Sequence, residues 1–428
     1  MASEMMHNIV RRLSSRGRAG AADARAWGPT PGGRWTSVDA LRGLTMVAML
    51  MANFVNDRAL RVADLPSWVR HAGAPDTMTP PDVIWPLFTF LLGLSIPLAV
   101  EHRRSVGESW GCIALHVLWR TASLMIIGVL TGTAWCHGGQ ARPLAMSVDV
   151  WNALMVVGCI LAWARLPRAT GRWKRIEVLV RLGGAGLLVC LAAIYREGPE
   201  LHWIRLRWWI LGTLAWGYLA AGIGYLLLRR RPAAIVGLAA LCILSYIGDC
   251  SGATGKIAWL AWLRWKLEIG GPIGIWAAMA VCGVVVGHLF TAGAGSLHPS
   301  RRVLWILVFG VGFYSAGFLL RPLYGCSKGG TTPTWALYSV AIGCVLAAVF
   351  HMLADGRRRR WAAPLVYVGR NSLLAYLIHE LLYPLVTLLG LKLPDSGLAG
   401  AARSIIIAAA VATAVGISAR LRLLRLRL

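Results

Sequence analysis

Apolar residues occur in long blocks along the chain, separated by short stretches rich in arginine, glycine or proline. A helix that crosses the hydrocarbon core of a bilayer needs about 20 mainly apolar residues, so each block predicts a membrane-spanning helix. The weakest of these blocks are 179–195, which contains Arg181, and 233–247, which is short. The predicted spans are 38–55, 82–100, 112–134, 148–164, 179–195, 208–228, 233–247, 272–290, 303–320, 333–353, 363–389 and 400–418.

The composition agrees with this pattern. Of 428 residues, 57% are hydrophobic and only 14% are charged, whereas about a quarter of the residues in a typical soluble domain are charged. A soluble globular enzyme, a disordered regulator and a secreted disulfide scaffold are therefore excluded. We expect an all-α polytopic membrane protein, a bundle of 11 or 12 spans.

Basic residues set the predicted orientation. The formal net charge of +26 would suggest nucleic-acid binding in a soluble protein. With the N-terminus in the cytoplasm, however, alternating loops place 26 Lys and Arg residues on the cytoplasmic side and 13 outside. This bias follows the positive-inside rule. We therefore expect both termini in the cytoplasm and no nucleic-acid partner.

One membrane domain, 36–420, is predicted between two basic tails. The tail 1–35 is rich in Arg, Gly and Ala and is expected to be disordered; its composition also resembles a transit peptide. The tail 421–428 is expected to be cytoplasmic. We expect an integral protein of a plasma membrane, such as the inner membrane of a bacterium, which can form a homodimer.

The nine cysteines give few signals. Most lie within predicted spans, where a thiol behaves as a small apolar group. Cys136, Cys250 and Cys326 fall on or near the external side and can form one disulfide, which the sequence does not pair. The chain has no Cys-x-x-Cys pattern, so we expect no structural zinc site and no metal cofactor.

Polar residues inside predicted spans are the first functional candidates, because charges in the bilayer centre are costly. On the first span a polar stripe extends from one end of the helix to the other. Asp39 and Arg42, three residues apart, can pair there, and a helix-end ion pair with an interhelical asparagine is the simpler interpretation. The stripe comprises Asp39, Arg42, Met46, Asn53 and Asp57.

A second cluster lies in the first external loop and at the start of the next span. His71 is in the loop, and a histidine there can act as an acid or base near neutral pH. Asp82 follows Pro81 and stands where a helix N-cap would stand. Helix capping and an inert loop histidine are the alternatives.

A third cluster is in the eleventh span. Ser372, Tyr376, His379 and Tyr383 are spaced to share one helix face, close to Glu380. Two explanations of this polar stripe remain open: interhelical hydrogen bonding and a polar cavity. Two further features are Arg120, which interrupts the third span, and a glycine-rich segment beginning at Lys328 at the external mouth of the tenth.

These motifs together resemble a known family. The matching segments are Ser37–Gly43 with Asn53, His71–Ala72, Thr79–Pro86 followed by Phe88, Phe90 and Gly93, Lys328, Thr332–Trp335, and Gly369–Tyr376 with His379–Glu380. In order and spacing they resemble the heparan-α-glucosaminide N-acetyltransferase family, from about residue 34 to residue 385.

The resemblance implies acetyl transfer from cytoplasmic acetyl-coenzyme A to a sugar amine on the opposite face. The residues fit this reaction: a base is needed at the far mouth, and we expect His71 to be that base, with Asp82 orienting it and Asn53 donating to the carbonyl oxygen. The residues implied for the donor are Arg42, Arg120, Lys328, Arg370, Asn371, Ser372 and His379. Acetyl-coenzyme A is the co-substrate, and the partners are an amino-sugar or oligosaccharide acceptor and the lipid bilayer.

Two other classes of function remain open. Many helices with a polar stripe are also typical of a transporter, here of amino sugars or related solutes, although no internal repeat is evident. A non-catalytic membrane scaffold is the other alternative; it predicts that Asn53, His71 and His379 are replaceable.

Overall fold

A computed structural model describes residues 34–56, 60–135, 146–166, 171–197, 200–267, 271–291, 297–355 and 359–426. The α-helices are α2 (Thr36–Asn56), α3 (Pro80–Ser105), α4 (Trp110–Trp135), α5 (Val148–Ala162), α6 (Arg172–Ile194), α7 (Ile210–Leu228), α8 (Pro232–Cys250), α9 (Ala258–Leu267), α10 (Gly271–His288), α11 (Pro299–Tyr324), α12 (Pro333–Ala354), α13 (Ala363–Arg370), α14 (Ser372–Leu388) and α15 (Gly397–Leu421). Short 3₁₀ helices are η2 (Ser67–Val69), η3 (Thr254–Lys256) and η5 (Arg359–Ala362), and the strands are β1 (Ala164–Arg165) and β2 (Arg425–Leu426).

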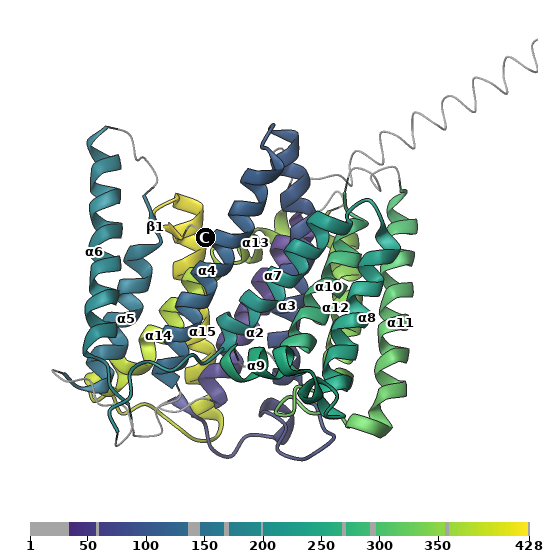
Figure 1. Cartoon of the computed structure of the whole chain (residues 1–428). Coiled ribbons are helices and arrows are strands. Elements are labelled where there is room, and N and C mark those ends of the chain that lie inside the picture. Colours follow the sequence, from purple (N-terminus) through teal and green to yellow (C-terminus); the bar gives the residue numbers. More distant parts are fainter. Residues whose placement is uncertain are drawn as a thin grey trace, which may run out of the picture.

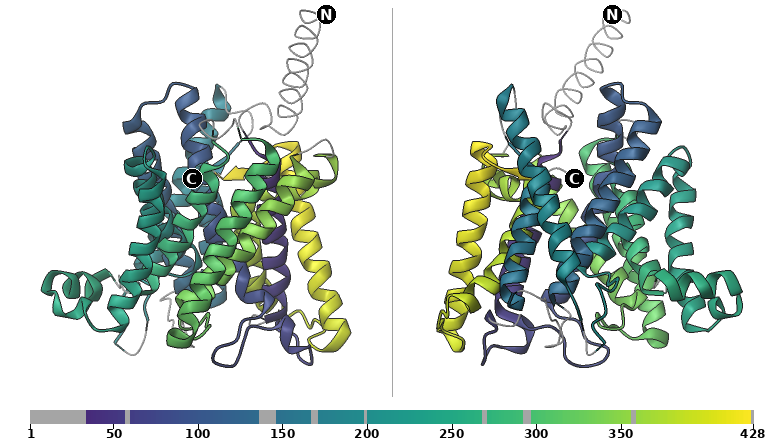
Figure 2. Two further views of the ribbon diagram at one scale, coloured as in Figure 1. Left: turned by 90° about the vertical axis from the view of Figure 1, so that its right-hand side faces the viewer. Right: turned by 60° about the vertical axis from the view of Figure 1, so that its left-hand side comes forward.

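The long helices stand side by side as a bundle with two ends (Figure 1). We call the end at which α2 begins the arginine end, and the end at which α2 finishes the histidine end, which carries the loop 60–79. Helices α2, α3, α7 and α12 are mostly buried inside the bundle, whereas α6, α8, α11 and α15 expose most of their surface. Figure 2 shows α9 projecting from one side, near the histidine end.

The all-α polytopic architecture is confirmed. Among the described residues, nine helices are long and apolar enough to cross a membrane, and α5, α10 and α14 are shorter apolar helices. Each predicted span coincides with helix, but the span predicted at 363–389 is two helices. Asn371, with φ −126° and ψ 30°, interrupts it between α13 and α14. The short α9 was not predicted.

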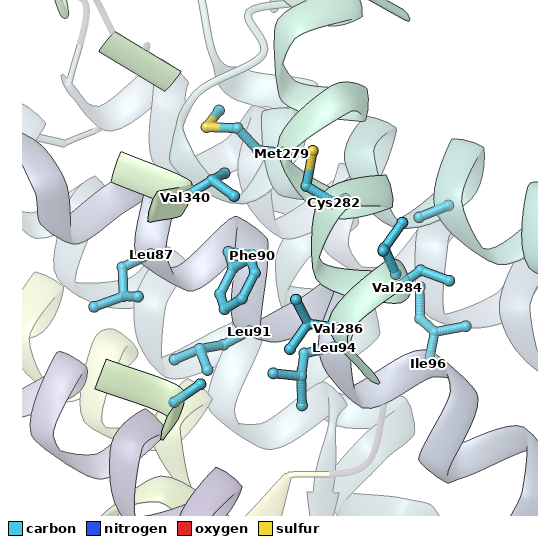
Figure 3. Close-up of a cluster of buried hydrophobic side chains, with 14 of the residues drawn as sticks. Leu87, Phe90, Leu91, Leu94, Ile96, Met279, Cys282, Val284, Val286 and Val340 are labelled. Carbon is cyan, nitrogen blue, oxygen red and sulfur yellow. The ribbon is translucent and has the colours of Figure 1, made fainter. Parts of the chain in front are cut away.

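Helices α3, α10 and α12 form the core of one half of the bundle (Figure 3). Phe90 of α3 is fully buried beside side chains of the two other helices. The labelled members of this core are Leu87, Phe90, Leu91, Leu94, Ile96, Met279, Cys282, Val284, Val286 and Val340. This rigid apolar block holds the start of α3, and with it Asp82, in place.

Helices α2 and α13 pack backbone against backbone at two glycines. A Cβ at Gly43 would overlap the carbonyl oxygen of Leu365, and a Cβ at Gly369 would overlap that of Asp39. Any side chain at either glycine would push the helices apart. This close approach brings Arg370, the next residue, against α2.

The two ends of the described chain are both structured at the arginine end. Trp35 is buried, and the backbone N–H of Ser37 donates to Asp355, the C-cap of α12, at 2.9 Å. At the other terminus, β2 pairs antiparallel with β1, with Arg425 opposite Arg165. The tail predicted at 421–428 therefore begins as part of the fold. Of the tail 1–35, only Arg34 and Trp35 fall within the described residues.

Candidate active site

His71 lies at the histidine end against the first turn of α3. Its Nδ1 is 2.7 Å from Asp82 Oδ1, so Nδ1–H donates to the carboxylate and the ring presents Nε2 as the acceptor. The other carboxylate oxygen accepts from the backbone N–H groups of Ala72 and Thr79. The Asp82 side chain is 1% exposed and that of His71 is 33% exposed. A buried carboxylate thus orients an imidazole that a solute can reach.

Asp82 was predicted at the N-cap, but the N-cap is Thr79. Asp82 is the third residue of the helix, and its carboxylate accepts from the Thr79 backbone N–H at 3.1 Å. This is the capping-box arrangement. Capping and orientation of His71 therefore use the same side chain, each through a different oxygen.

Lys328, from the loop between α11 and α12, completes this group. Its Nζ lies 3.0 Å from His71 Nδ1 and 3.3 Å from Nε2, and 3.7 Å from Asp82 Oδ1. The resemblance implied Lys328 among the donor-binding residues. Its contacts instead lie at the histidine end, where its ammonium group is beside both the His71 imidazole and the Asp82 carboxylate.

Asn56 supports the His71 loop, a role that the sequence interpretation did not anticipate. Its side-chain oxygen accepts from the His71 backbone N–H at 3.2 Å, and its amide donates to the Val69 carbonyl. The available signal was its position three residues after Asn53, because residues so spaced lie close together on one helix face.

A second anchor fixes the same loop to the rest of the bundle. The Asp76 carboxylate accepts from the Arg321 guanidinium, with Nε to Oδ1 at 3.0 Å, and from the backbone N–H of Cys326 at 2.7 Å. These hydrogen bonds, that from Arg321 foremost, hold the pKa of Asp76 below its usual value. Asp76 therefore joins the loop that carries His71 to the loop that carries Lys328.

Asn53 contacts the other predicted histidine. Its Nδ2 is 3.0 Å from His379 Nε2, and the Tyr383 hydroxyl is 3.0 Å from the same nitrogen. His379 is fully buried. The predicted stripe on α14 thus meets α2, while among the described residues Asn53 makes no hydrogen bond with His71 or Asp82.

Next to this contact is a cavity of about 200 Å³ at the histidine end. Trp135 donates to Glu380 across its wall at 2.5 Å. The side-chain oxygen of Asn152 is buried there without a hydrogen-bond partner among the described residues. The lining is formed by Ala134, Trp135, Asp149, Asn152, Met155, Val156, Glu380, Tyr383, Pro384 and Thr387.

The arginine end holds a larger cavity, of about 590 Å³, which extends into the bundle. Six arginines and one aspartate line it, an excess of five positive charges. The charged lining comprises Arg34, Asp39, Arg42, Arg120, Arg165, Arg370 and Arg425, and Ser95, His102, Asn371 and Ser372 are among its other members. Such a cavity fits a polyanion.

Asp39 organises half of these arginines. Its carboxylate accepts from Arg34 Nε at 3.0 Å, Arg42 Nη1 at 3.1 Å and Arg370 Nε at 3.3 Å. Arg42 also donates to Ser95 on α3 at 2.6 Å. The predicted Asp39–Arg42 pair is present in the structure.

Arg120 differs from the arginines that bind Asp39. Its guanidinium lies 4.9 Å from the ring centre of Tyr218, and its Nε is buried without a hydrogen-bond partner among the described residues. Stacking on an aromatic face holds the group in place while leaving its hydrogen-bonding edge available.

Five of the seven residues implied for the donor line the arginine cavity: Arg42, Arg120, Arg370, Asn371 and Ser372. Lys328 and His379 lie at the histidine end instead. Of the cysteines considered for a disulfide, Cys250 and Cys326 are free thiols, and Cys136 lies outside the described residues. The described residues contain no group of three or more side chains suited to a metal.

Comparison with known proteins gives a match for the segment that carries His71 and Asp82. No curated protein matches the chain at a significant level. Residues 34–137, which contain α2 to α4 with Asp39, His71, Asp82 and Arg120, match the family model described as heparan-alpha-glucosaminide N-acetyltransferase, catalytic. Through this segment the chain is similar to a heparan-alpha-glucosaminide N-acetyltransferase-like family, and the similarity supports a membrane-embedded N-acetyltransferase in general.

Proposed function

We propose that the protein takes acetyl from acetyl-coenzyme A at the arginine end and transfers it to the amine of an amino sugar at the histidine end. The observation that carries the proposal is the opposition of two sites: a cavity lined by six arginines at one end of α2, and the His71–Asp82 pair at the other. Both draw on the segment that matches the catalytic family model.

The arginine cavity suits the phosphates of coenzyme A. Guanidinium groups bind phosphate oxygens in pairs of hydrogen bonds. The cavity also receives the N-terminal residue of α14, Ser372, because the helix is interrupted at Asn371. A helix N-terminus carries partial positive charge and favours an anion. The N-terminus of α14, created by the interruption at Asn371, thus adds to the positive charge that the arginines supply.

The distance between the ends suits an extended donor. Arg42 and Asn56 are both on α2, and at 1.5 Å per residue they lie about 21 Å apart along the helix axis. The phosphates of acetyl-coenzyme A are separated from its thioester by the long pantetheine arm. A donor held by its phosphates at Arg42 therefore directs its thioester towards the histidine end.

His71 is the base in this proposal. The acceptor nitrogen attacks the thioester carbonyl as a neutral amine, after its ammonium form has lost one proton to solvent. His71 Nε2 takes the second proton from the attacking nitrogen, and the carbon–sulfur bond breaks to release coenzyme A thiolate. Asp82 keeps Nδ1 protonated and so keeps Nε2 available. Lys328 supplies positive charge for the oxygen on which negative charge develops. We propose direct transfer, without an acetyl-histidine intermediate.

The cavity beside His379 supports a small cationic acceptor. Asp149 and Glu380 contribute carboxylates, and Trp135 and Tyr383 contribute aromatic faces. Carboxylates attract an ammonium group, and aromatic faces attract a cation. An amino sugar carries such a group beside an apolar ring face.

We further propose that the arginine end faces the cytoplasm of a bacterial inner membrane, where acetyl-coenzyme A is made. The charge distribution of the loops supports this orientation.

Purified protein in lipid nanodiscs, given acetyl-coenzyme A labelled in the acetyl group and glucosamine, tests the proposal. We expect labelled N-acetylglucosamine and free coenzyme A. A transporter predicts a different result: uptake of labelled glucosamine into proteoliposomes without acetyl-coenzyme A, and no binding of coenzyme A to the protein. A scaffold predicts neither product nor uptake.

A further inference from the structure

We propose that Arg165 and Arg425, paired across β1 and β2, bind the terminal ribose phosphate of coenzyme A, so that the segment after α15 forms part of the donor site. This inference rests on the proposed function for the identity of the donor. What it adds is a phosphate-binding pair built by a segment that the sequence suggested was a tail.

The two arginines are direct partners in an antiparallel ladder. The register places Arg165 opposite Arg425 and Ala164 opposite Leu426. Side chains directly opposite in such a ladder project to the same side of the sheet. Both arginines line the arginine cavity, and both are exposed. They therefore stand together at its mouth, where a polyanion would enter.

The pairing places like charges together. Like charges directly opposite each other destabilise a strand pair, and among the described residues neither guanidinium makes a salt bridge with an acid. Burial, together with the nearby Arg422, Arg34, Arg370 and Arg165, lowers the pKa of Arg425. A bound phosphate would relieve this repulsion by contacting both guanidinium groups.

Other contacts hold the strand pair despite this repulsion. Two residues on each strand are too few for stability on their own. The Leu424 carbonyl accepts from Asn371 Nδ2 at 2.9 Å and from the Ser418 hydroxyl at 3.2 Å. Asn371 is the residue that interrupts the eleventh span. The strand with Arg425 is thus tied to the break that opens the cavity.

The positions of the arginines along the cavity indicate which phosphate each would bind, and the pair Arg165 and Arg425 would bind the ribose 3′-phosphate. Arg120 is ten residues from the start of α4, which corresponds to about 15 Å along the helix axis. Arg165 and Arg425 lie beyond the ends of α5 and α15. The pantetheine arm must extend inwards, so the inner arginines would contact the pyrophosphate. The ribose 3′-phosphate, at the other end of the nucleotide, would then reach the outer pair.

Phosphate at this position can also come from an anionic lipid headgroup. The two sources are distinguished by dephospho-coenzyme A, which lacks only the ribose 3′-phosphate. Binding of each nucleotide is measured by calorimetry in nanodiscs of neutral phosphatidylcholine, and again with anionic phosphatidylglycerol added. The proteins compared are wild type, Arg425→Gln, Arg425→Glu and the matched control Arg420→Gln, which alters an exposed arginine outside the cavity.

We expect wild type and Arg420→Gln to prefer coenzyme A over dephospho-coenzyme A. Arg425→Gln should weaken coenzyme A binding about tenfold, the effect of about one charge-assisted hydrogen bond, while leaving dephospho-coenzyme A binding unchanged. Arg425→Glu is the sharper variant, because glutamate opposite Arg165 would stabilise the strand pair. If the role of Arg425 is only structural, this variant keeps the preference; if it binds phosphate, the preference is lost.

The outcomes separate this inference from the proposed function. An unchanged preference in Arg425→Gln and Arg425→Glu overturns the phosphate assignment while coenzyme A binding itself stands. A difference between the variants that emerges only with phosphatidylglycerol assigns the pair to lipid and also overturns it. Failure of wild type to bind either nucleotide contradicts the proposed function instead.

Discussion

Asn53 and Asn56 lie one turn apart on α2, and each contacts a different histidine. Asn56 accepts from the backbone N–H of His71, whereas Asn53 contacts the ring of His379. The first histidine is partly exposed and the second is fully buried. One helix therefore positions an accessible imidazole and a buried one, and our proposal assigns the role of base to the accessible one.

This relationship predicts the effect of Asn56→Ala. Losing the contacts to Val69 and His71 should loosen the loop and misplace the base. We expect acetyl transfer to fall about tenfold, as for the loss of about 1.4 kcal/mol of transition-state stabilisation. Coenzyme A binding should not change. Steady-state kinetics and calorimetry measure the two effects; weakened coenzyme A binding would mean that Asn56 acts on the donor.

Arg120 and Asp39 should respond differently to neutral substitutions. Arg120 has no acid partner among the described salt bridges, so Arg120→Gln should weaken acetyl-coenzyme A binding with little change in thermal stability. Asp39→Asn leaves three arginines without their shared carboxylate and should lower the melting temperature. Equal donor binding by Arg120→Gln and wild type would remove Arg120 from the donor site.

Asp76 should keep its loop bound to Arg321 and Cys326 throughout the neutral pH range. A carboxyl whose pKa is lowered on folding contributes above its unfolded value, about 3.9, and loses that contribution only as the pH falls further. Asp76→Asn should therefore speed alkylation of the buried Cys326 by the same factor from pH 6 to pH 8, in a variant without the other reactive cysteines. A factor that shrinks between pH 8 and pH 6 would contradict this.

The orientation is tested by labelling single cysteines from outside the cell. Ser67 in η2 and Ser105 at the end of α3 are both exposed and lie at opposite ends of the bundle. In a variant cleared of other reactive cysteines, Ser67→Cys should react with an impermeant reagent and Ser105→Cys should not. The reverse pattern would place the arginine end outside.

Much of this fold follows from the sequence because span length and apolar content are local properties. The Asp39–Arg42 pair was predictable for the same reason, since residues three apart on a helix lie together. The sequence also indicated that His71 and Asp82 lie close together, because only eleven residues separate them along the chain.

Other features depend on contacts between distant segments. The helix α13, which precedes the break at Asn371, packs on α2 through Gly43 and Gly369, and the strand pair joins residues near 165 and 425. Lys328 comes 257 residues after His71. No periodicity or local propensity encodes such contacts. The sequence placed Lys328 only at the external mouth of the tenth span, and the family resemblance assigned it to the donor.

The rate of acetyl transfer by His71→Ala, measured beside His202→Ala, tests most directly whether His71 is the general base. His202 is an exposed histidine whose Nε2 lies 2.7 Å from a Glu200 carboxylate oxygen, so the control removes a similar pair outside the site. General-base catalysis contributes about 10²–10⁴-fold. We predict a loss in this range for His71→Ala, with unchanged coenzyme A binding, and no loss for His202→Ala. A His71→Ala rate within tenfold of wild type would contradict the account and leave His379 as the next candidate.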